Sequence, residues 1–435
     1  MEWKKEYSQK LVSHEEAVRI VKSGDKVYTG TASSVAYGLA EALWERRNEL
    51  EGVEIQSSQA FEPSPLYGNF DENPFSYNTY FVGVNERKAL RSGMSVDFNS
   101  VHLSQVDIWC RQNARPDVAF FEVSLPDENG YMSYGPSGVA IAKDIKAAAK
   151  KIVLEVNSKV PYVYGEDNLI HVSEADLIVE YERPIMSYET PAADETAQQL
   201  SKLIIDEVPD GATIQLGLGN ISTAIGYGLK TKNDLGIHTE LFNQPMLDLI
   251  ENGNVTNKHK GFMDGKTVYS FALGTEKLYD ALDKNPDYYC IPFTYANDPR
   301  VIAQNKKMIS INTTMSIDLY GQAASDCLGW RQQSATGGQV DFVRGAQWSE
   351  GGKSFIATTS SFIKDGKRVS RIVPCFAPGS VVTTTRSDIQ YVATEYGCVN
   401  LKPLSAADRA RAIISLAHPE FRELLTDEAK KYGII

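Results

Sequence analysis

The chain has 435 residues, a length typical of roughly two to three domains. Lys and Arg number 44 against 56 Asp and Glu, which gives a formal net charge of −12, and 42% of the residues are apolar. This composition is that of a globular protein and excludes a disordered tail, a collagen-like fibre or a coiled coil. An acidic chain without a basic block is also a poor candidate for binding nucleic acid or an anionic membrane surface.

The cysteines and the apolar runs indicate where the protein functions. The five cysteines are scattered and form no CxxC pair, which is typical of buried thiols in a reducing compartment. The polar N-terminal residues lack the apolar stretch of a signal peptide. No window contains eighteen consecutive apolar residues, so no membrane-spanning helix is predicted. We therefore expect a soluble, cytoplasmic protein.

The first predicted elements form a helix and a strand that leads into a glycine. Ser13 and Glu16 form a capping box, the helix after them ends at Gly24, and residues 26–29 form a strand before Gly30. The elements predicted after Gly30 are a helix over residues 37–43 and strands over residues 53–56, 118–123 and 152–156.

The same pattern returns 187 residues further on, where Gly217 takes the place of Gly30. A helix after Asp194 ends before a strand over residues 213–216, and Gly217-Leu-Gly219 follows the strand. The next predicted elements are a helix over residues 224–229 and a strand over residues 237–240. Chance similarity of two βα units is the alternative, since α/β proteins repeat such units. We interpret the repeat as two related α/β domains, residues 1–187 and 188–435, divided where prolines and polar residues interrupt the periodicity.

The remaining strands indicate the kind of sheet. Residues 308–311 and 372–373 are nearly continuously apolar, like residues 118–123, which is typical of strands covered on both faces in parallel sheets. A second capping box at Ser405 opens a C-terminal helix that Pro419 interrupts. The predicted fold class is therefore α/β, with two open domains and mostly parallel sheets.

Gly217-Leu-Gly219 is the strongest candidate for a binding turn. It follows a strand and opens a helix, and Glu240 ends the next strand 21 residues after Gly219. That is nearly the dinucleotide-binding layout, but Ser222 stands where the third glycine is required. The turn can also present backbone N–H groups at a helix N-terminus to an anion or oxyanion. The residues alone leave both interpretations open.

Glu240 is the candidate nucleophile. It sits at the C-terminal end of its strand, where open α/β sheets bind ligands, and a carboxylate there can attack a group whose oxyanion the turn stabilises. His238 shares its strand face and could orient Glu240, although a buried structural histidine is the commoner case. Gly337-Gly338 is predicted as a second glycine-rich turn, at the start of a strand.

Four segments carry a resemblance to a known family. They are Gln215-Leu-Gly-Leu-Gly219, Leu235-Gly-Ile-His-Thr-Glu240, Gly337-Gly-Gln-Val-Asp-Phe342 and Tyr391-Val-Ala-Thr-Glu-Tyr-Gly397. The chain resembles the acetyl-CoA hydrolase/transferase family, and within it most resembles butyryl-CoA:acetate and 4-hydroxybutyrate CoA-transferases. The resemblance runs in order from Trp3 to Phe421.

The resemblance implies roles for particular residues. It makes Glu240 the catalytic nucleophile and places the CoA thioester beside the loop Gln215, Leu216, Gly217, Leu218 and Gly219. It adds CoA contacts at Met315, Gly338 and Lys364, and implies open α/β halves with CoA between them, a homodimer, and no bound cofactor or metal. The chain departs from the family pattern at Asn220-Ile-Ser222 and over residues 241–246, which leaves the acyl preference open.

The predicted function is transfer of CoA from a short-chain acyl-CoA, such as butyryl-CoA, to a carboxylate such as acetate. The reaction would be ping-pong, through a glutamyl-CoA thioester on Glu240. The alternatives are a short-chain acyl-CoA hydrolase, a nicotinamide-dependent oxidoreductase that uses Gly217-Leu-Gly219 and Glu240, and a non-catalytic CoA-binding protein. The expected partners are acyl-CoA and short-chain carboxylates.

Overall fold

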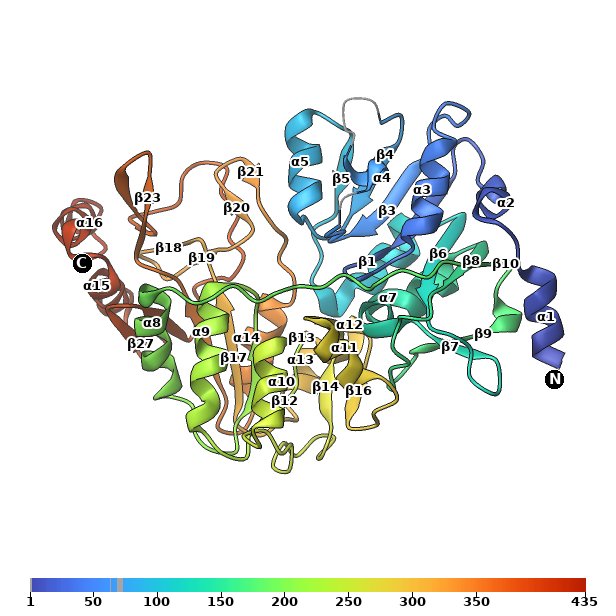
Figure 1. Ribbon diagram of the computed structural model, residues 1–435. Helices are drawn as coiled ribbons and strands as arrows, with labels where there is room; N and C mark the ends of the chain where they lie inside the picture. Colours follow the sequence, from blue (N-terminus) through green and yellow to red (C-terminus); the bar gives the residue numbers. More distant parts are fainter. Residues whose placement is uncertain (1, 63, 69–72) are drawn as a thin grey trace. The chain divides into compact units, whose positions relative to one another are not determined.

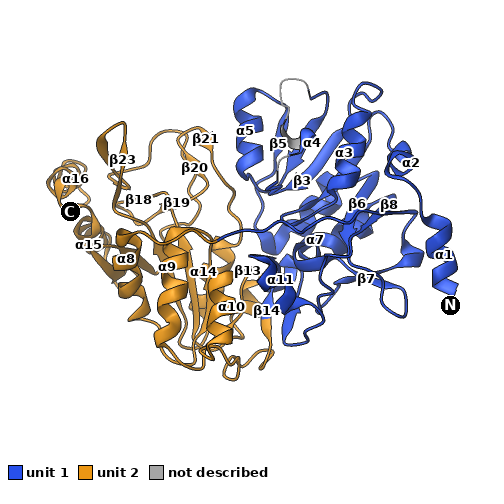
Figure 2. Cartoon of the chain, in the orientation of Figure 1, with its two compact units in different colours: residues 1–189, 268–296 blue, residues 190–267, 297–435 orange. Residues whose placement is uncertain are grey.

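The structure is a computed structural model that describes residues 2–62, 64–68 and 73–435 (Figure 1). The chain divides into two compact units (Figure 2): unit 1 comprises Met1–Glu189 and Val268–Ala296, and unit 2 comprises Thr190–Thr267 and Asn297–Ile435. The predicted division assigns residues 188–435 to one domain. Residues 268–296 nevertheless belong by compactness to unit 1, where β15 (Phe271–Leu273) contacts α7 (Gly135–Ala148).

Unit 1 is built on a sheet whose main path is entirely parallel. Its strands follow the order β10 (Leu177–Glu180), β8 (Lys151–Val156), β6 (Val118–Val123), β1 (Lys26–Thr31), β3 (Glu54–Ser58), β4 (Ser76–Thr79) and β5 (Val96–Phe98), and β2 (Ser34–Val35) pairs antiparallel with β1. Every residue of β6 is buried. This confirms the prediction that continuously apolar runs form strands inside a parallel sheet.

The helices of unit 1 bury apolar side chains against this sheet. Leu39 and Leu43 of α3 belong to the same core cluster as Val27, Val118 and Val153 of the strands. The helices of the unit are α1 (Glu2–Lys10), α2 (His14–Ala17), α3 (Tyr37–Glu45), α4 (Pro65–Gly68), α5 (Val84–Ser92), α6 (Val106–Trp109), α7, α11 (Glu276–Leu282) and α12 (Phe293–Ala296). Short strand pairs are β7 (Tyr131–Ser133) with β9 (Leu169–His171), and β14 (Thr267–Tyr269) with β16 (Tyr288–Cys290).

Unit 2 is built on a second, mostly parallel sheet. Its order is β12 (Gly236–Ile237), β11 (Thr213–Leu216), β17 (Met308–Thr313), β22 (Lys353–Ala357), β26 (Tyr391–Thr394) and β27 (Gly397–Asn400), and β26–β27 is its antiparallel pair. The path β12-β11-β17-β22-β26 repeats the path β3-β1-β6-β8-β10 of unit 1. The predicted fold of two related α/β units is therefore confirmed.

The helices of unit 2 pack beside this sheet. Figure 1 shows α8 (Glu195–Ile205), α9 (Asn220–Gly228) and α10 (Gln244–Glu251) side by side, and α9 contacts both neighbours. The other helices are α13 (Pro299–Ile302), α14 (Gln339–Trp348), α15 (Ala406–Leu416) and α16 (Pro419–Lys431). The short strands are β13 (Leu241–Asn243), β18 (Ser316–Asp318), β19 (Ala323–Ala324), β20 (Cys327–Leu328), β21 (Arg331–Gln332), β23 (Ser361–Lys364), β24 (Lys367–Ser370) and β25 (Ile372–Val373).

Local signals in the sequence have mixed outcomes. The capping box at Ser13 is confirmed, Asp194 caps α8, and Ser405 caps α15. The strand predicted after Gly338 is wrong, because α14 begins there and buries Phe342 and Ala346 on one helical face. Among the described residues, every helix is too short or too polar to cross a membrane.

Candidate active site

Glu240 lies in unit 2, in the link between β12 and β13, and its side chain is half-buried. The side-chain amide of Asn297 donates a hydrogen bond to Oε2 of Glu240 over 2.8 Å. The backbone N–H of Gly338, at the N-terminus of α14, also donates to the carboxylate. Asn297 is fully buried. These two donors therefore hold the carboxylate in one orientation.

Gly338 approaches Glu240 so closely that no side chain fits at this position. A Cβ atom built on Gly338 would lie 2.0 Å from Oε2 of Glu240 and 2.2 Å from the Asn297 amide nitrogen. Both distances are far below van der Waals contact. The close approach makes Gly338 part of the carboxylate's cradle, because any larger residue would displace Glu240.

The environment of Glu240 raises the pKa of its carboxyl group to about 7. Burial is the largest cause, and the negative charge of Asp341 in α14 acts in the same direction. The hydrogen bonds from Asn297 and Gly338 oppose the rise, because they stabilise the ionised form. A carboxylate with a pKa near neutrality is more basic than an ordinary glutamate and still ionises at physiological pH, which suits a nucleophile.

His238, the residue that shares the predicted strand face with Glu240, is fully buried. Its ring packs against Phe262 at 5.9 Å and Phe342 at 6.2 Å between centroids. These aromatic contacts indicate a structural histidine, the commoner of the two alternatives.

The glycine turn after β11 presents two backbone N–H groups. The N–H of Gly217 is bonded to the carbonyl of Ile311 over 3.2 Å, whereas those of Leu218 and Gly219 donate to no group among the described residues. Gly219 has φ = 108°, a conformation that requires glycine, and α9 begins at the next residue. The two N–H groups at this helix N-terminus are therefore the candidate oxyanion donors.

Gln215 and Leu216 lie inside the sheet that supports the turn. Leu216 is fully buried, and Oε1 of Gln215 accepts from the backbone N–H of Ile311 and from the side-chain amide of Asn312, both over 3.2 Å. These contacts join β11 to β17 immediately before the turn. Both residues thereby fix the position from which Leu218 and Gly219 project.

A cavity of about 550 Å³ opens beside the turn within unit 2. Leu218, Gly219 and Met315 line it, whereas Glu240 and Gly338 do not, and Lys364 lies exposed on the hairpin of β23 and β24. The complete lining is Asp194, Thr196, Leu218, Gly219, Asn220, Ile221, Thr313, Thr314, Met315, Ser325, Thr358, Thr359, Ser361, Phe362 and Arg371. The structure thus divides the predicted site residues into the Glu240 cradle, the cavity, the supporting strand and the hairpin. Their roles stay predictions.

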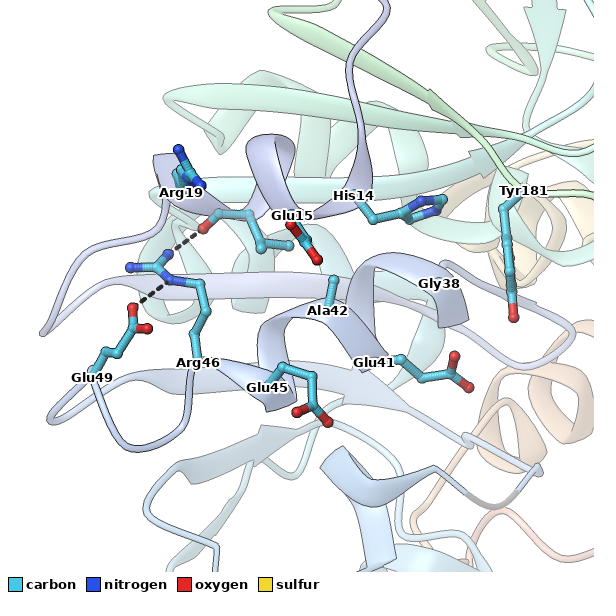
Figure 3. A pocket seen from close by; sticks show the side chains of 11 residues that line it. His14, Glu15, Arg19, Gly38, Glu41, Ala42, Glu45, Arg46, Glu49 and Tyr181 are labelled. Atoms are coloured by element: carbon cyan, nitrogen blue, oxygen red, sulfur yellow. Dashed lines mark hydrogen bonds and ion pairs between the residues drawn. The ribbon is translucent and has the colours of Figure 1, made fainter.

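A larger cavity of about 900 Å³ lies in unit 1, beside α2 and α3 (Figure 3). Its walls are rich in carboxylates, among them Glu41 and Glu45, and its Arg46 is already paired with Glu49 over 3.2 Å. An anionic ligand such as CoA is repelled by such walls. Size alone therefore does not identify the site of chemistry.

Three residues of the site were missed from the sequence alone. Asn297 has no motif, and only the fold brings it to Glu240. Asp341 belongs to the segment Gly337–Phe342, whose glycines drew attention to a turn instead of to the acid. Arg371 lies beyond the hairpin that contains Lys364, and its charge was not distinguished from that of other surface residues.

Fold and site together define an α/β protein of two related units with a cradled carboxylate of raised pKa. The N-terminal half matches the family "Acetyl-CoA hydrolase/transferase N-terminal domain" over residues 1–188. The C-terminal half matches "Acetyl-CoA hydrolase/transferase C-terminal domain" over residues 274–429. The chain belongs to the acetyl-CoA hydrolase/transferase family and is an enzyme of that class.

Full-length relatives extend this finding. The chain is 38% identical to a 4-hydroxybutyrate coenzyme A transferase of Clostridium kluyveri, over 99% of this chain and 100% of the relative. It is 37% identical to a butyryl-CoA:acetate CoA-transferase of Anaerostipes caccae, over 100% of this chain and 99% of the relative. The crystal structure of RipA from Yersinia pestis superimposes with a TM-score of 0.93 at 37% identity, and each chain covers 100% of the other.

Proposed function

We propose that this protein transfers CoA from a short-chain acyl-CoA, such as butyryl-CoA, to a carboxylate such as acetate, with Glu240 as the covalent carrier. The observation that supports the proposal most directly is the cradle of Glu240, in which Asn297 and Gly338 orient a carboxylate whose pKa is raised to about 7. Carboxylates are weak nucleophiles, so orientation and raised basicity are what this chemistry needs.

The reaction proceeds in two covalent half-reactions. Glu240 attacks the thioester carbonyl, the C–S bond breaks, and an acyl-glutamyl anhydride and CoA thiolate form. The thiolate then attacks the glutamyl carbonyl of the anhydride, which releases the first acid and leaves a glutamyl-CoA thioester. The incoming carboxylate reverses both steps. Each addition creates an oxyanion, and the N–H groups of Leu218 and Gly219 at the N-terminus of α9 are its proposed donors.

The nicotinamide alternative loses its support at Glu240. In a dinucleotide site this carboxylate would face the ribose bound at the glycine turn. Here the donors to this carboxylate are Asn297 and Gly338, and Ser222 replaces the third glycine of the turn. The relatives' names describe transfer of CoA to carboxylates, which favours transferase over hydrolase activity. A homodimer, a cytoplasmic location and the absence of a resident cofactor stay predictions.

The test is to trap the glutamyl thioester. Protein incubated with butyryl-CoA and then treated with borohydride should contain a primary alcohol in place of the Glu240 carboxyl, detected by peptide mass spectrometry. Glu240→Gln should form no adduct and lose activity by about 10⁴-fold or more, as expected when a covalent nucleophile is removed.

Glu207→Gln is the matched control, because Glu207 lies in the same unit and pairs with Lys353 on the surface. It should turn over and form the adduct like the wild type. An unmodified Glu240 peptide from actively transferring protein would refute the mechanism. Sustained thiol release without acetate would instead identify a hydrolase.

A further inference from the structure

The cavity beside Gly219 contains an arginine that has no acidic partner. Arg371 follows β24 and is half-buried, and its guanidinium makes no ion pair among the described residues. Its Nη1 donates to the carbonyl of Met315 over 3.1 Å, whereas its Nε is buried and has no partner in the described part of the chain. The guanidinium stacks on Phe362 at 4.6 Å from the ring centroid. The positive charge is therefore held in place without being neutralised.

The backbone around Arg371 fixes the position of this charge. Its N–H donates to the carbonyl of Ser360 over 2.9 Å, and its own carbonyl accepts from Ile317 and from the hydroxyl of Ser316, each over 2.9 Å. Burial lowers the pKa of Arg371 from its usual range. Because arginine remains protonated in proteins, this shift reflects an uncompensated cation that an anion would stabilise.

The rest of the cavity wall suits an anionic or highly polar ligand. Its lining residues include six that carry hydroxyl groups, namely Thr313, Thr314, Ser325, Thr358, Thr359 and Ser361. The carboxylate that lines it, Asp194, is already engaged by the N–H of Ala197 and the amide of Asn220. The adjoining hairpin carries Lys364 and Lys367 against the single acid Asp365, and its Arg368 is paired with Glu420. In a chain of net charge −12, this is a local concentration of positive charge.

We propose that Arg371 binds a phosphate group of the CoA substrate and thereby determines affinity for CoA thioesters over thioesters that lack phosphates. The inference rests on the proposed function, since it takes acyl-CoA as the substrate. Arg371 is the one cation among the described residues that line this cavity, and the thioester carbonyl is uncharged before attack, so the partner of Arg371 is an anionic part of the substrate. The anionic groups of acyl-CoA away from its thioester are its phosphates, which arginine binds through charge-assisted, often bidentate hydrogen bonds.

The experiment compares Arg371→Gln with the wild type on butyryl-CoA and on butyryl-pantetheine, with acetate as acceptor. We expect kcat/KM for butyryl-CoA to fall by about 10- to 100-fold, mainly through KM, as for the loss of a charged hydrogen bond. On butyryl-pantetheine, the variant and the wild type should agree within about threefold. A third substrate, butyryl-3′-dephospho-CoA, identifies the phosphate that Arg371 binds. If Arg371→Gln lowers kcat/KM for this substrate as much as for butyryl-CoA, Arg371 binds the diphosphate. If the substitution no longer lowers kcat/KM, Arg371 binds the 3′-phosphate.

Arg368→Gln, on the hairpin that precedes Arg371, is the matched control. Arg368 pairs with Glu420 and Ser361 and does not line the cavity, so its variant should keep the wild-type ratio of the two substrates. Equal losses on both substrates, or no loss on either, would overturn the proposal. If Arg371→Gln does not fold, Arg371→Met gives the same comparison, because methionine removes the charge and keeps an unbranched apolar side chain.

Failure of this inference is distinguishable from failure of the proposed function. Borohydride trapping on wild-type protein reports the Glu240 thioester independently of Arg371. If the adduct forms at Glu240 but Arg371→Gln changes kcat/KM for butyryl-CoA and for butyryl-pantetheine equally, only the role of Arg371 is rejected.

Discussion

In each unit a helix follows the first strand of the repeat. In unit 1 this helix, α3, begins at the carboxylate of Glu155, and in unit 2 the corresponding helix, α9, begins beside a cavity. In unit 1, Glu155 of β8 accepts from the backbone N–H groups of Gly38 over 3.3 Å and Leu39 over 2.7 Å at the start of α3. In unit 2, the turn before α9 directs the N–H groups of Leu218 and Gly219 to no such group among the described residues.

The sheet registers locate the cause of this difference. Val27 of β1 and Ile214 of β11 correspond in the repeat, and their neighbours are Val118 and Ile309. Counted from Val118 and Ile309, Glu122 in unit 1 and Thr313 in unit 2 each lie four residues further along these neighbouring strands. Their partners on the next strand are Glu155 and Ala357. Where unit 1 has two buried glutamates, unit 2 thus has two small neutral residues, one of which, Thr313, lines the cavity.

Unit 1 neutralises its acids from within. Nε of Arg183 lies 3.4 Å from Oε1 of Glu122, and the Asn157 amide donates to the same oxygen over 3.0 Å. Nη1 of Arg183 pairs with Glu62 over 2.7 Å. The same α/β fold thus has a helix N-terminus that is bonded to a carboxylate in unit 1 and one that is open in unit 2. The two units differ there at two positions, which are Glu122 and Glu155 in unit 1 and Thr313 and Ala357 in unit 2.

The largest effect is expected when the unit 1 arrangement is copied into unit 2. Thr313→Glu should lower kcat/KM for butyryl-CoA by about 100-fold relative to Thr313→Gln. The two side chains have similar size, but only the glutamate repels anionic CoA and competes for the N–H groups of the turn, and like charges in contact cost several kcal/mol. Steady-state kinetics of the two variants give the comparison. Equal rates would show that charge does not distinguish the two units.

A smaller effect, on stability, is expected when the carboxylate of unit 1 is removed. Glu155→Ala should lower the free energy of unfolding of unit 1 by about 1–3 kcal/mol, because buried N–H groups lose their acceptor. Urea unfolding followed by fluorescence measures this change, and kcat of the folded enzyme should change by less than about threefold. Glu45→Ala, on the exposed face of the same α3, is the control and should be nearly neutral. If the two variants are equally stable, Glu155 is not the cap that its hydrogen bonds indicate.

The smallest effect concerns pH and compares the two carboxyl groups whose pKa burial raises to about 7, Glu122 and Glu240. Activity should follow Glu240, so kcat/KM should rise with pH through about 7 as the nucleophile ionises. Asp341→Asn removes a like charge and so lowers the pKa of Glu240. It should therefore move the acidic limb of the pH–rate profile to lower pH by about one unit or less. Asn297→Ala should move it in the opposite direction. If neither substitution moves the acidic limb of the pH–rate profile, that limb reports the ionisation of a group other than Glu240.

Glu122→Gln should leave the activity limb in place and change stability instead. The pKa of Glu122 is raised in the folded protein, so its ionisation costs stability as pH rises from about 4.5 to about 7. The glutamine variant escapes this cost. Its thermal midpoint relative to the wild type should therefore be higher at pH 8 than at pH 5, measured by differential scanning fluorimetry.

Much of the fold followed from local signals in the sequence. Val118–Val123 is a strand because a buried parallel strand needs apolar residues on both faces. Asp194 and Ser405 begin helices because their side chains satisfy free N–H groups there. The repeat around Gly30 and Gly217 predicted two related units, since similar strand–turn patterns favour similar folds. The sequence also pointed to Glu240 as the candidate nucleophile, although the strand predicted over residues 237–240 is wrong in its end, because the observed strand stops at Ile237 and Glu240 lies in the link that follows.

Only the tertiary structure decided how that candidate is held and which unit is open. Asn297 and Gly338 lie 57 and 98 residues after Glu240 in the chain, and no local pattern brings them to one carboxylate. The assignment of Val268–Ala296 to unit 1 and the place of Arg371 in the wall of the cavity beside Gly219 are equally non-local. Sequence determines what each segment forms, because propensity and capping act within a few residues. The raised pKa of Glu240 and the unneutralised charge of Arg371 come instead from burial and from distant neighbours, which exist only once the strands are paired.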